Sequence, residues 1–312
     1  MGSSLRFNPE TLPWLDRIYA EIDAYVDNLQ TLPASYDLRE ALVHWMRFGY
    51  VRLSQVISHS EIDRYVEHVT HAMTNPAGFK FAVNIQGHGY KPICEHDPKA
   101  LSNPHLRLCD FHNTSNVGKS LSLSRPVVEF LGHVFRSRIV AMQTLTFIHG
   151  TEQPLHQDHA YVVSEIPSHL AASWIALEDV KPEAGPLIFY PASHQVKMFN
   201  WGDGMFLTPE SSSDENDFAA YLQDEVDRVD LEPHYELAKK GDVFLWHATL
   251  VHGGSAVKTP GTTRKSLVTH YSTLDAYTRD RRQPDAVPEC FEINGGYVFG
   301  NPLLPEEENS LL

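Results

Sequence analysis

The feature that most constrains the fold is a succession of short β-type segments in the second half of the chain. Runs of β-branched and aromatic residues, bounded by Gly and Pro, cover residues 139–148, 173–177, 186–190, 242–246 and 266–271. No long helical segment is expected between them. Short strands that follow one another without crossover helices form antiparallel sandwiches or barrels. The sequence therefore predicts a mainly β core over residues 139–275.

The first part of the chain has helical rather than β periodicity. Apolar residues recur at helical spacing over residues 15–25, 38–48, 62–73 and 125–135, and Ser58 offers N-cap chemistry to the third segment. Gly49 ends the second segment, and residues 50–53 are expected to form a short strand. We expect residues 1–75 to form a helical layer on the β core, within a single α+β domain spanning residues 1–312.

Two segments are less regular. Residues 76–122 are rich in Gly, Pro, His and Asn, and we expect short strands and loops there that contribute to a substrate pocket. Residues 197–236 form a long acidic insertion, of the kind that forms a lid or is disordered. Its aromatic residues, Phe199, Trp201 and Phe206, together with Tyr161, Phe189 and Trp246, either line an apolar lid or cap the barrel.

A candidate metal site lies within the β region. His156 and Asp158 are two residues apart, so on a strand their side chains point the same way. His252 follows the strand expected at 242–246, which a jelly roll would bring opposite the first pair. Two His and one carboxylate on one face are the ligands of a non-haem Fe(II) site, and they leave coordination positions open. We therefore predict that His156, Asp158 and His252 are metal ligands and catalytic residues.

Arg264 begins the last expected strand and offers a counter-charge to an anionic cosubstrate. A guanidinium binds a carboxylate through two hydrogen bonds and keeps its charge when buried. Ser266 lies on the same face and can add a hydroxyl, and His270 on that face could line the pocket. His247 is the alternative third ligand, but it closes an apolar strand, where a packed or hydrogen-bonded histidine is the expected role.

The composition of the chain limits the classes of partner and the cellular location that we expect. The chain has 25 Lys and Arg against 40 Asp and Glu, a formal net charge of -15, which disfavours binding to nucleic acid. Three cysteines, Cys94, Cys109 and Cys290, are too few for a disulfide framework or a zinc cluster. No apolar run is long enough to cross a bilayer, and the start lacks the apolar region of a signal peptide. We expect a cytoplasmic protein that does not bind membranes.

These motifs together resemble the phytanoyl-CoA dioxygenase family of Fe(II)/2-oxoglutarate oxygenases. The similar segments are residues 154–161, 174–179, 183–187, 191–194 and 240–253, and the resemblance extends over about residues 40–275. It implies a double-stranded β-helix, a jelly roll of the cupin type, with Fe(II) at His156, Asp158 and His252. Two turns differ from the family pattern: Ala184-Gly185 stands where Asn-Gly is usual, and Ala192 where Gly is usual.

The resemblance also implies the chemistry. Arg264 would hold the distal carboxylate of 2-oxoglutarate, Trp174 would line the cosubstrate site, and Gln143 is a weaker candidate for cosubstrate or substrate contact. Dioxygen would be the second cosubstrate, with succinate and CO2 as coproducts. The expected outcome is hydroxylation of a C–H bond, with desaturation, epimerisation or ring formation as alternatives. Related halogenases replace the carboxylate ligand, so the intact Asp158 favours hydroxylation.

The substrate and two other classes of function stay open at this point. Tyr161, Phe189 and His270 are candidate substrate contacts, and a small molecule is the expected substrate. One alternative is a cupin-like metal oxygenase that does not use 2-oxoglutarate. The other is a catalytically silent jelly-roll binding protein. Succinate formation tests the first alternative, and Fe(II) or Mn(II) binding tests the second. The sequence gives no oligomeric state.

Overall fold

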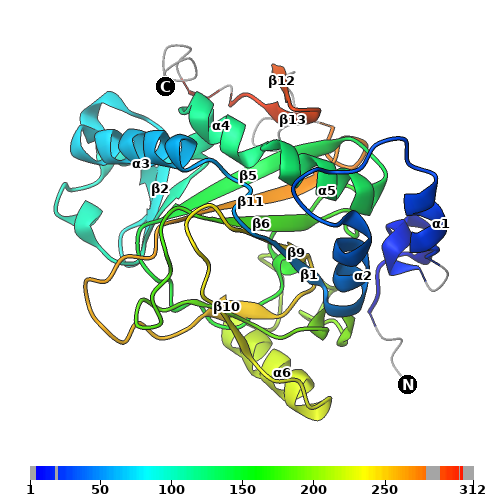
Figure 1. Cartoon of the computed structure of the whole chain (residues 1–312). Coiled ribbons are helices and arrows are strands. Elements are labelled where there is room, and N and C mark those ends of the chain that lie inside the picture. Colours follow the sequence, from blue (N-terminus) through cyan, green and yellow to red (C-terminus); the bar gives the residue numbers. More distant parts are fainter. Residues whose placement is uncertain (1–4, 18–19, 279–288, 302, 305–312) are drawn as a thin grey trace.

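Two β-sheets face each other through the middle of the molecule, and helices cover the outer face of the larger sheet (Figure 1). The computed structural model describes residues 5–17, 20–278, 289–301 and 303–304. Of the expected N-terminal helical segments, residues 1–4, 18 and 19 lie outside the described residues. The helix expected over residues 15–25 is shorter than predicted, because only α1, Ile22–Asp27, is an α-helix there.

The larger sheet has ten strands, and the smaller has three. The larger contains β1 Tyr50–Leu53, β2 Ala82–Ile85, β3 Gly89–Pro92, β4 Leu106–Cys109, β5 Ile139–Phe147, β6 Ala171–Ala176, β9 Val243–His247, β11 Ser266–Thr273, β12 Cys290–Ile293 and β13 Gly296–Phe299. Its main path is β1-β9-β6-β11-β5-β4-β2-β3, all antiparallel, and β13 adds a parallel pairing to β5. The smaller sheet is β10-β7-β8, formed by β10 His252–Gly254, β7 Leu187–Phe189 and β8 His234–Glu236. The five strands expected between residues 139 and 271 are present, and so is the short strand expected over residues 50–53.

The main helices are those that the apolar periodicity predicts. They are α2 Leu38–Phe48, α3 His59–Thr74 and α5 Arg125–Phe135. The Asp37 carboxylate caps α2 by accepting from the Glu40 amide, and Gly49 ends it in the left-handed conformation. A side chain at Gly49 would also meet His194, so glycine is needed there for two reasons. No helix in the described part of the chain is both long and apolar enough to cross a membrane.

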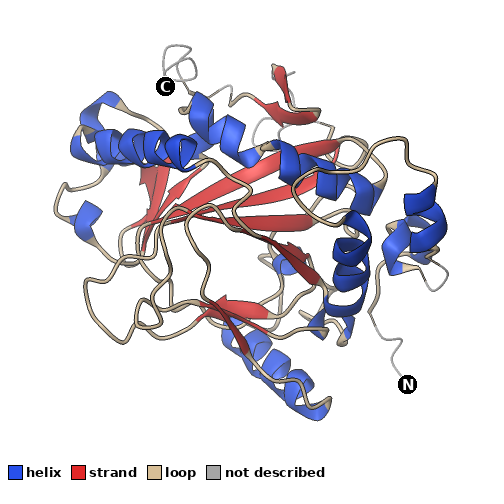
Figure 2. Ribbon diagram, in the orientation of Figure 1, coloured by secondary structure: helices blue, strands red, loops and turns tan. Residues whose placement is uncertain are grey.

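Two helices were not expected from the sequence. One is α4, Asn116–Ser122, in the segment predicted to hold only strands and loops. The other is α6, Glu215–Arg228, in the acidic insertion, where a capping box between Asp214 and Asp217 starts the helix. Its apolar stripe, Phe218, Leu222 and Val226, packs under the smaller sheet with Trp201 (Figure 2). This helix was not predicted because the high average polarity of the acidic segment masks its apolar stripe.

The apolar core has two main layers separated by the larger sheet. One lies between that sheet and the helices, where Leu42, Ile62 and Leu131 meet Leu267. The other lies between the two sheets and is rich in aromatic rings. Alternation along β11 sends Leu267 and Thr269 to the helices, and Val268 and His270 to the inside. The inner face of β11 therefore projects into the space between the sheets.

The two turns that depart from the family pattern keep the geometry that glycine provides. Gly185 has φ +69°, and a Cβ there would lie 2.7 Å from the Ser255 carbonyl oxygen. Ala192 has φ +68°, a left-handed conformation that costs a non-glycine residue about 1 kcal/mol. Its amide donates to the Phe48 carbonyl at 2.8 Å, which ties this turn to the end of α2.

Candidate metal centre and its cavity

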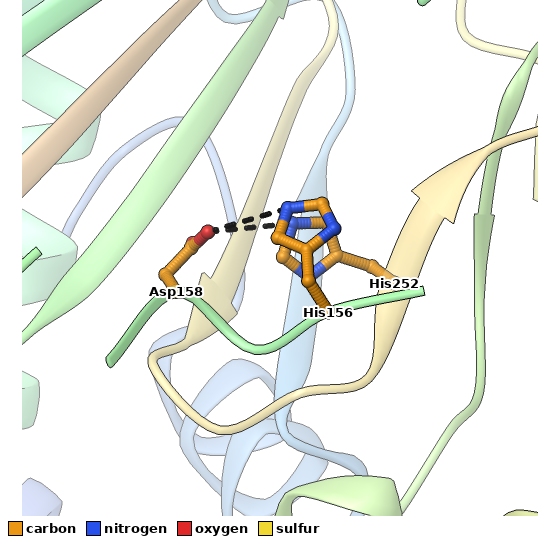
Figure 3. A group of neighbouring side chains, drawn as sticks. All are labelled: His156, Asp158 and His252. Atoms are coloured by element: carbon orange, nitrogen blue, oxygen red, sulfur yellow. Dashed lines mark ion pairs between the residues drawn. The ribbon is translucent and has the colours of Figure 1, made fainter. Parts of the chain in front are cut away.

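The three predicted ligands converge in the space between the sheets (Figure 3). His156 and His252 form an isolated antiparallel bridge, with mutual backbone hydrogen bonds of 2.9 and 3.1 Å. Asp158 is the first residue of a 3-10 turn, Asp158–Ala160. The expectation that His156 and Asp158 share a regular strand is therefore wrong. The chain turns immediately after the bridge and brings the carboxylate round to face both imidazoles.

The spacing of the three side chains suits a metal ion better than a direct hydrogen bond. Asp158 Oδ1 lies 3.7 Å from His156 Nε2 and 3.6 Å from His252 Nε2. Donor atoms bound to one ion at about 2.0–2.2 Å lie on the order of 3–4 Å from one another. Within the described residues, these three form the sole group of His, Cys, Asp or Glu side chains with ligand atoms this close together.

Backbone carbonyls fix the tautomer of both histidines. His156 Nδ1 lies 2.9 Å from the Pro154 oxygen, and His252 Nδ1 lies 3.0 Å from the Leu250 oxygen. A carbonyl oxygen only accepts, so each Nδ1 carries the proton and each Nε2 presents a lone pair. Both lone pairs are thus available on the atoms that face Asp158. Such outer hydrogen bonds are the usual support of metal-binding imidazoles.

The protonation states also match those of a metal site. Burial, followed by the neighbouring His252, lowers the pKa of His156 to about 3, so its imidazole is neutral near pH 7. Burial alone would raise the pKa of Asp158. The surrounding histidines, His252 first, outweigh that effect and hold the pKa well below its usual range. The neutral imidazole of His156 and the ionised carboxylate of Asp158 are forms that bind a divalent cation.

Buried neutral histidines predict acid-sensitive stability in the metal-free protein. Burial lowers the pKa of His156 to about 3 and that of His159 and His194 to about 4. The unfolded chain takes up these protons near pH 6.5, so the free energy of unfolding is highest above that pH and falls towards pH 4. We expect a loss of about 2 kcal/mol per histidine at pH 5, measured by urea unfolding at pH 7.5 and 5.0. His194→Asn should reduce the dependence of the free energy of unfolding on pH, whereas replacement of the exposed His88 by Asn should not. A free energy of unfolding that is the same at pH 7.5 and 5.0 would contradict this expectation.

Arg264 is a buried cation without an acidic partner. Its side chain is 2% exposed, and its Nη1 donates to the Gly185 carbonyl oxygen at 2.8 Å. It forms no ion pair with any carboxylate of the described residues, and burial lowers its pKa to about 10. Its Nε is also unpartnered within that part of the chain. An unpaired buried charge is costly, so an anion bound beside Arg264 would stabilise this site.

Two further unpaired polar atoms lie near Arg264. They are Trp174 Nε1 and Ser266 Oγ, both buried without a hydrogen-bond partner in the described structure. Trp174 on β6 pairs with Val268 of β11, and its ring centroid lies 6.0 Å from the Arg264 guanidinium carbon. Three predicted cosubstrate residues, Arg264, Trp174 and Ser266, therefore lie in one region, and each has a donor group without a hydrogen-bond acceptor in the described structure. A carboxylate supplies such acceptors.

A single cavity of about 860 Å³ joins most of the predicted residues. Its lining includes the three metal-ligand candidates together with Gln143, Tyr161, Trp174, Arg264 and His270. Ser266 is buried and does not line the cavity. Phe189 does not reach it either, because its ring packs against Phe244 and Tyr50 at centroid distances of 4.7 and 4.8 Å. The prediction that Phe189 contacts substrate therefore finds no support in its position.

The sequence analysis missed several side chains that the fold brings to the cavity. It also missed a contact of Trp246, which was considered only as an apolar residue: the Trp246 indole N–H donates to Asp158 Oδ2 at 2.8 Å. Asn84 on β2 and Arg107 on β4 lie opposite each other and line the outer wall, with Glu215 at the start of α6. Residues 105–109 alternate polar and apolar side chains, which was the available signal for an inward-facing strand.

His247 has the structural role that its apolar strand predicts. Its Nδ1 accepts from the Thr249 amide, and its Nε2 donates to Asp16 Oδ2 at 3.2 Å, which holds the N-terminal segment to β9. We expect His247→Ala to lower the free energy of unfolding by about 1–3 kcal/mol in a urea titration. Metal affinity, measured by Co(II) titration, should stay within about two-fold. Loss of metal binding in this variant would overturn the ligand assignment.

Sequence comparison supports the family resemblance. The phytanoyl-CoA dioxygenase family pattern matches residues 45–266, which is most of the chain. A phytanoyl-CoA dioxygenase domain-containing protein 1 from Danio rerio is 27% identical over 176 residues, covering 54% of this chain and 49% of that protein. Peroxisomal phytanoyl-CoA dioxygenase from Rattus norvegicus is 22% identical over 244 residues, covering 73% of this chain and 66% of that protein. The match thus spans about half to two thirds of these relatives.

Solved structures share the fold. EctD from S. alaskensis, with 2-oxoglutarate and 5-hydroxyectoine, superposes with a TM-score of 0.62 at 17% identity, covering 96% of this chain and 98% of that one. The epimerase SnoN, in complex with Fe3+, alpha ketoglutarate and nogalamycin RO, superposes with a TM-score of 0.58 at 17% identity, covering 86% and 96%. The predicted jelly-roll core is confirmed by this similarity.

Proposed function

The chain belongs to the phytanoyl-CoA dioxygenase family, and on that premise we propose that it is a non-haem Fe(II)/2-oxoglutarate-dependent dioxygenase that oxidises a C–H bond of a small molecule. The observation that carries the proposal is the pairing of a two-histidine, one-carboxylate centre with a buried, unpaired arginine in one cavity. The centre alone would suit many metal enzymes. The arginine adds a binding site for the far end of a dicarboxylate.

Each candidate residue has a defined task in this proposal. His156, Asp158 and His252 hold Fe(II) through the two Nε2 atoms and the carboxylate. Arg264 binds the distal carboxylate of 2-oxoglutarate, with Trp174 as a further donor. Ser266, predicted for the same task, does not line the cavity, so its contribution stays a prediction. When bound, Fe(II) with 2-oxoglutarate supplies dioxygen activation, with succinate and CO2 as coproducts. Tyr161 and His270 line the cavity where the substrate lies, and Gln143 hydrogen-bonds to His270.

The charge of the cavity supports a substrate that is not a polyanion. Among the described lining residues the cations are Arg107 and Arg264, and the carboxylates besides Asp158 are Asp110, Glu152 and Glu215. The chain as a whole is strongly acidic. An acyl-CoA carries several phosphate charges that this wall would repel, and a nucleic acid carries more. We therefore favour a small metabolite or natural-product intermediate.

Hydroxylation is the reaction that the ligand set favours. Asp158 is retained as a carboxylate, so it occupies the position that a halide would need. Desaturation, epimerisation and ring formation start from the same hydrogen abstraction, and the choice among them depends on the substrate. We also propose that residues 1–312 act as one domain, with the helical layer 1–75 and the insertion 197–236 attached to the jelly roll at 139–275.

The decisive experiment is a screen for substrate-stimulated succinate formation. The protein is supplied with Fe(II), 2-oxoglutarate and air, and panels of small polar metabolites are compared with acyl-CoAs. Stimulation by a small molecule supports the proposal in full. Oxygen consumption without succinate would indicate a cupin-like oxygenase that does not use 2-oxoglutarate. Failure to bind Fe(II) or Mn(II) would indicate a silent binding protein.

A further inference from the structure

The two oxygens of Asp158 face different surroundings. Oδ1 is directed at the histidine pair, 3.6 Å from His252 Nε2 and 3.7 Å from His156 Nε2. Oδ2 accepts a hydrogen bond of 2.8 Å from the indole N–H of Trp246, on β9. The carboxylate is thus held on its far side by a rigid donor from another strand. Rotation that turned Oδ2 towards the histidines would break this bond.

A second donor lies behind the same oxygen. His270 Nε2 is 3.4 Å from Asp158 Oδ2, and its Nδ1 is 3.2 Å from the Gln143 amide nitrogen. A carboxylate only accepts, so His270 Nε2 carries the proton towards Asp158. Its Nδ1 then accepts from Gln143, its partner across β5 and β11. The 3.4 Å separation is long, so Trp246 is the main contact and His270 a supporting one.

We propose that Trp246, assisted by His270 and Gln143, is a positioning residue that restricts Asp158 to binding metal through one oxygen. This inference rests on the proposed function, because the number of open positions matters only for a site that also binds 2-oxoglutarate and dioxygen. Three single-atom ligands leave three of six octahedral positions free. A bound 2-oxoglutarate would need two of these positions, and dioxygen would need the third. A two-oxygen Asp158 would fill the position that dioxygen needs.

Packing alone does not explain the Trp246 hydrogen bond. The indole N–H groups of two other buried tryptophans that lie outside the proposed cosubstrate site, Trp45 and Trp201, make no hydrogen bond within the described residues. The fold therefore tolerates an unpaired buried indole N–H at positions chosen for ring volume. Trp246 is only 2% exposed and so is as buried as these rings, yet its N–H donates a hydrogen bond to Asp158, a predicted metal ligand. Trp45, packed against Phe130 on the helical side of the larger sheet, is a matched control.

The test compares Trp246→Phe with Trp45→Phe in the full-length protein. We measure Co(II) affinity by titration, and nitric oxide binding to the Fe(II)–2-oxoglutarate complex by EPR, because nitric oxide reports the open position. Trp246→Phe should weaken Co(II) binding about 10–100-fold and weaken nitric oxide binding at least about ten-fold. Trp45→Phe should leave both within about two-fold of the parent. Parent-like values for both measurements in Trp246→Phe would overturn the inference.

Two further variants guard against a folding defect. Replacing Trp246 with benzothienylalanine keeps the ring shape and exchanges the N–H for sulfur, so it should reproduce the loss without disturbing packing. His270→Leu should give a smaller loss, and His270→Gln, which retains an N–H donor, should restore part of it. If the parent itself fails to bind Co(II) and Fe(II), the proposed function fails together with the inference. If the parent binds both and the benzothienylalanine protein matches it, the inference alone fails.

Discussion

Asp158→Ala is expected to abolish substrate oxidation, with turnover below about one thousandth of the parent rate. Among the described residues, Asp158 is the carboxylate that faces His156 and His252 at 3.6–3.7 Å, and its removal takes both a charge and a candidate ligand from the centre. Charge stabilisation by a bound metal is worth several kcal/mol, and about 4 kcal/mol corresponds to three orders of magnitude in rate. The measurement is succinate formation with the best substrate of the screen, alongside Co(II) titration.

His247→Ala is the control for that prediction. It removes a buried histidine that hydrogen-bonds to Asp16, and it leaves the three ligands in place. Retained hydroxylation by Asp158→Ala, in a buffer free of halide, would show that this carboxylate is not a ligand. Loss of metal in His247→Ala with metal retained in Asp158→Ala would require exchange of the two roles. Chlorination by Asp158→Ala in the presence of chloride would agree with the assignment, because a halide would then take the vacated position.

The β core was predictable because its strands have local signatures. Alternation, β-branched residues and bounding Gly or Pro residues identify β5, β6, β9 and β11 within a few residues of their observed ends. The helices α2 and α5 begin and end as expected, because Asp37 and Gly49 bound α2 and Pro126 stands in the first turn of α5. The helix α6 was missed because its apolar stripe is spread through an acidic segment. Its capping box was the signal that average polarity concealed.

The site contacts that could not be predicted from the sequence are those that depend on the pairing of distant strands. The metal-ligand candidates and Arg264 have residue types that are unusual enough to stand out in a sequence, and the fold brings them into one cavity. The hydrogen bond from Trp246 to Asp158 joins residues 88 positions apart, and nothing in either segment identifies the partner. Phe189 was assigned to substrate for its type, but the register that places it opposite His252 also packs its ring between Tyr50 and Phe244.

Arg264→Met is expected to weaken 2-oxoglutarate binding and to stabilise the free protein. Charge-assisted hydrogen bonds contribute about 1.5–3 kcal/mol each, so loss of a two-bond contact should raise the KM for 2-oxoglutarate about 100–10,000-fold. Turnover at saturating cosubstrate should fall much less. In the free protein the guanidinium is buried without an acidic partner among the described residues. Replacement by an apolar side chain of similar length should therefore raise the free energy of unfolding, by about 1–4 kcal/mol.

Arg52→Met is the control for Arg264→Met. It tests whether loss of any arginine that contacts a buried group changes stability and 2-oxoglutarate binding in the same way. Arg52 pairs with the fully buried carboxylate of Glu236 at 2.6 Å, so its removal strands a charge and should destabilise the protein, while the KM for 2-oxoglutarate stays unchanged. Opposite signs of the stability change in the two variants, measured by urea unfolding, are the expected result. An unchanged KM in Arg264→Met would place the distal carboxylate elsewhere, with Arg107 as the remaining cation of the cavity wall. Destabilisation of Arg264→Met would show instead that its bond to the Gly185 carbonyl outweighs the cost of its unpaired charge.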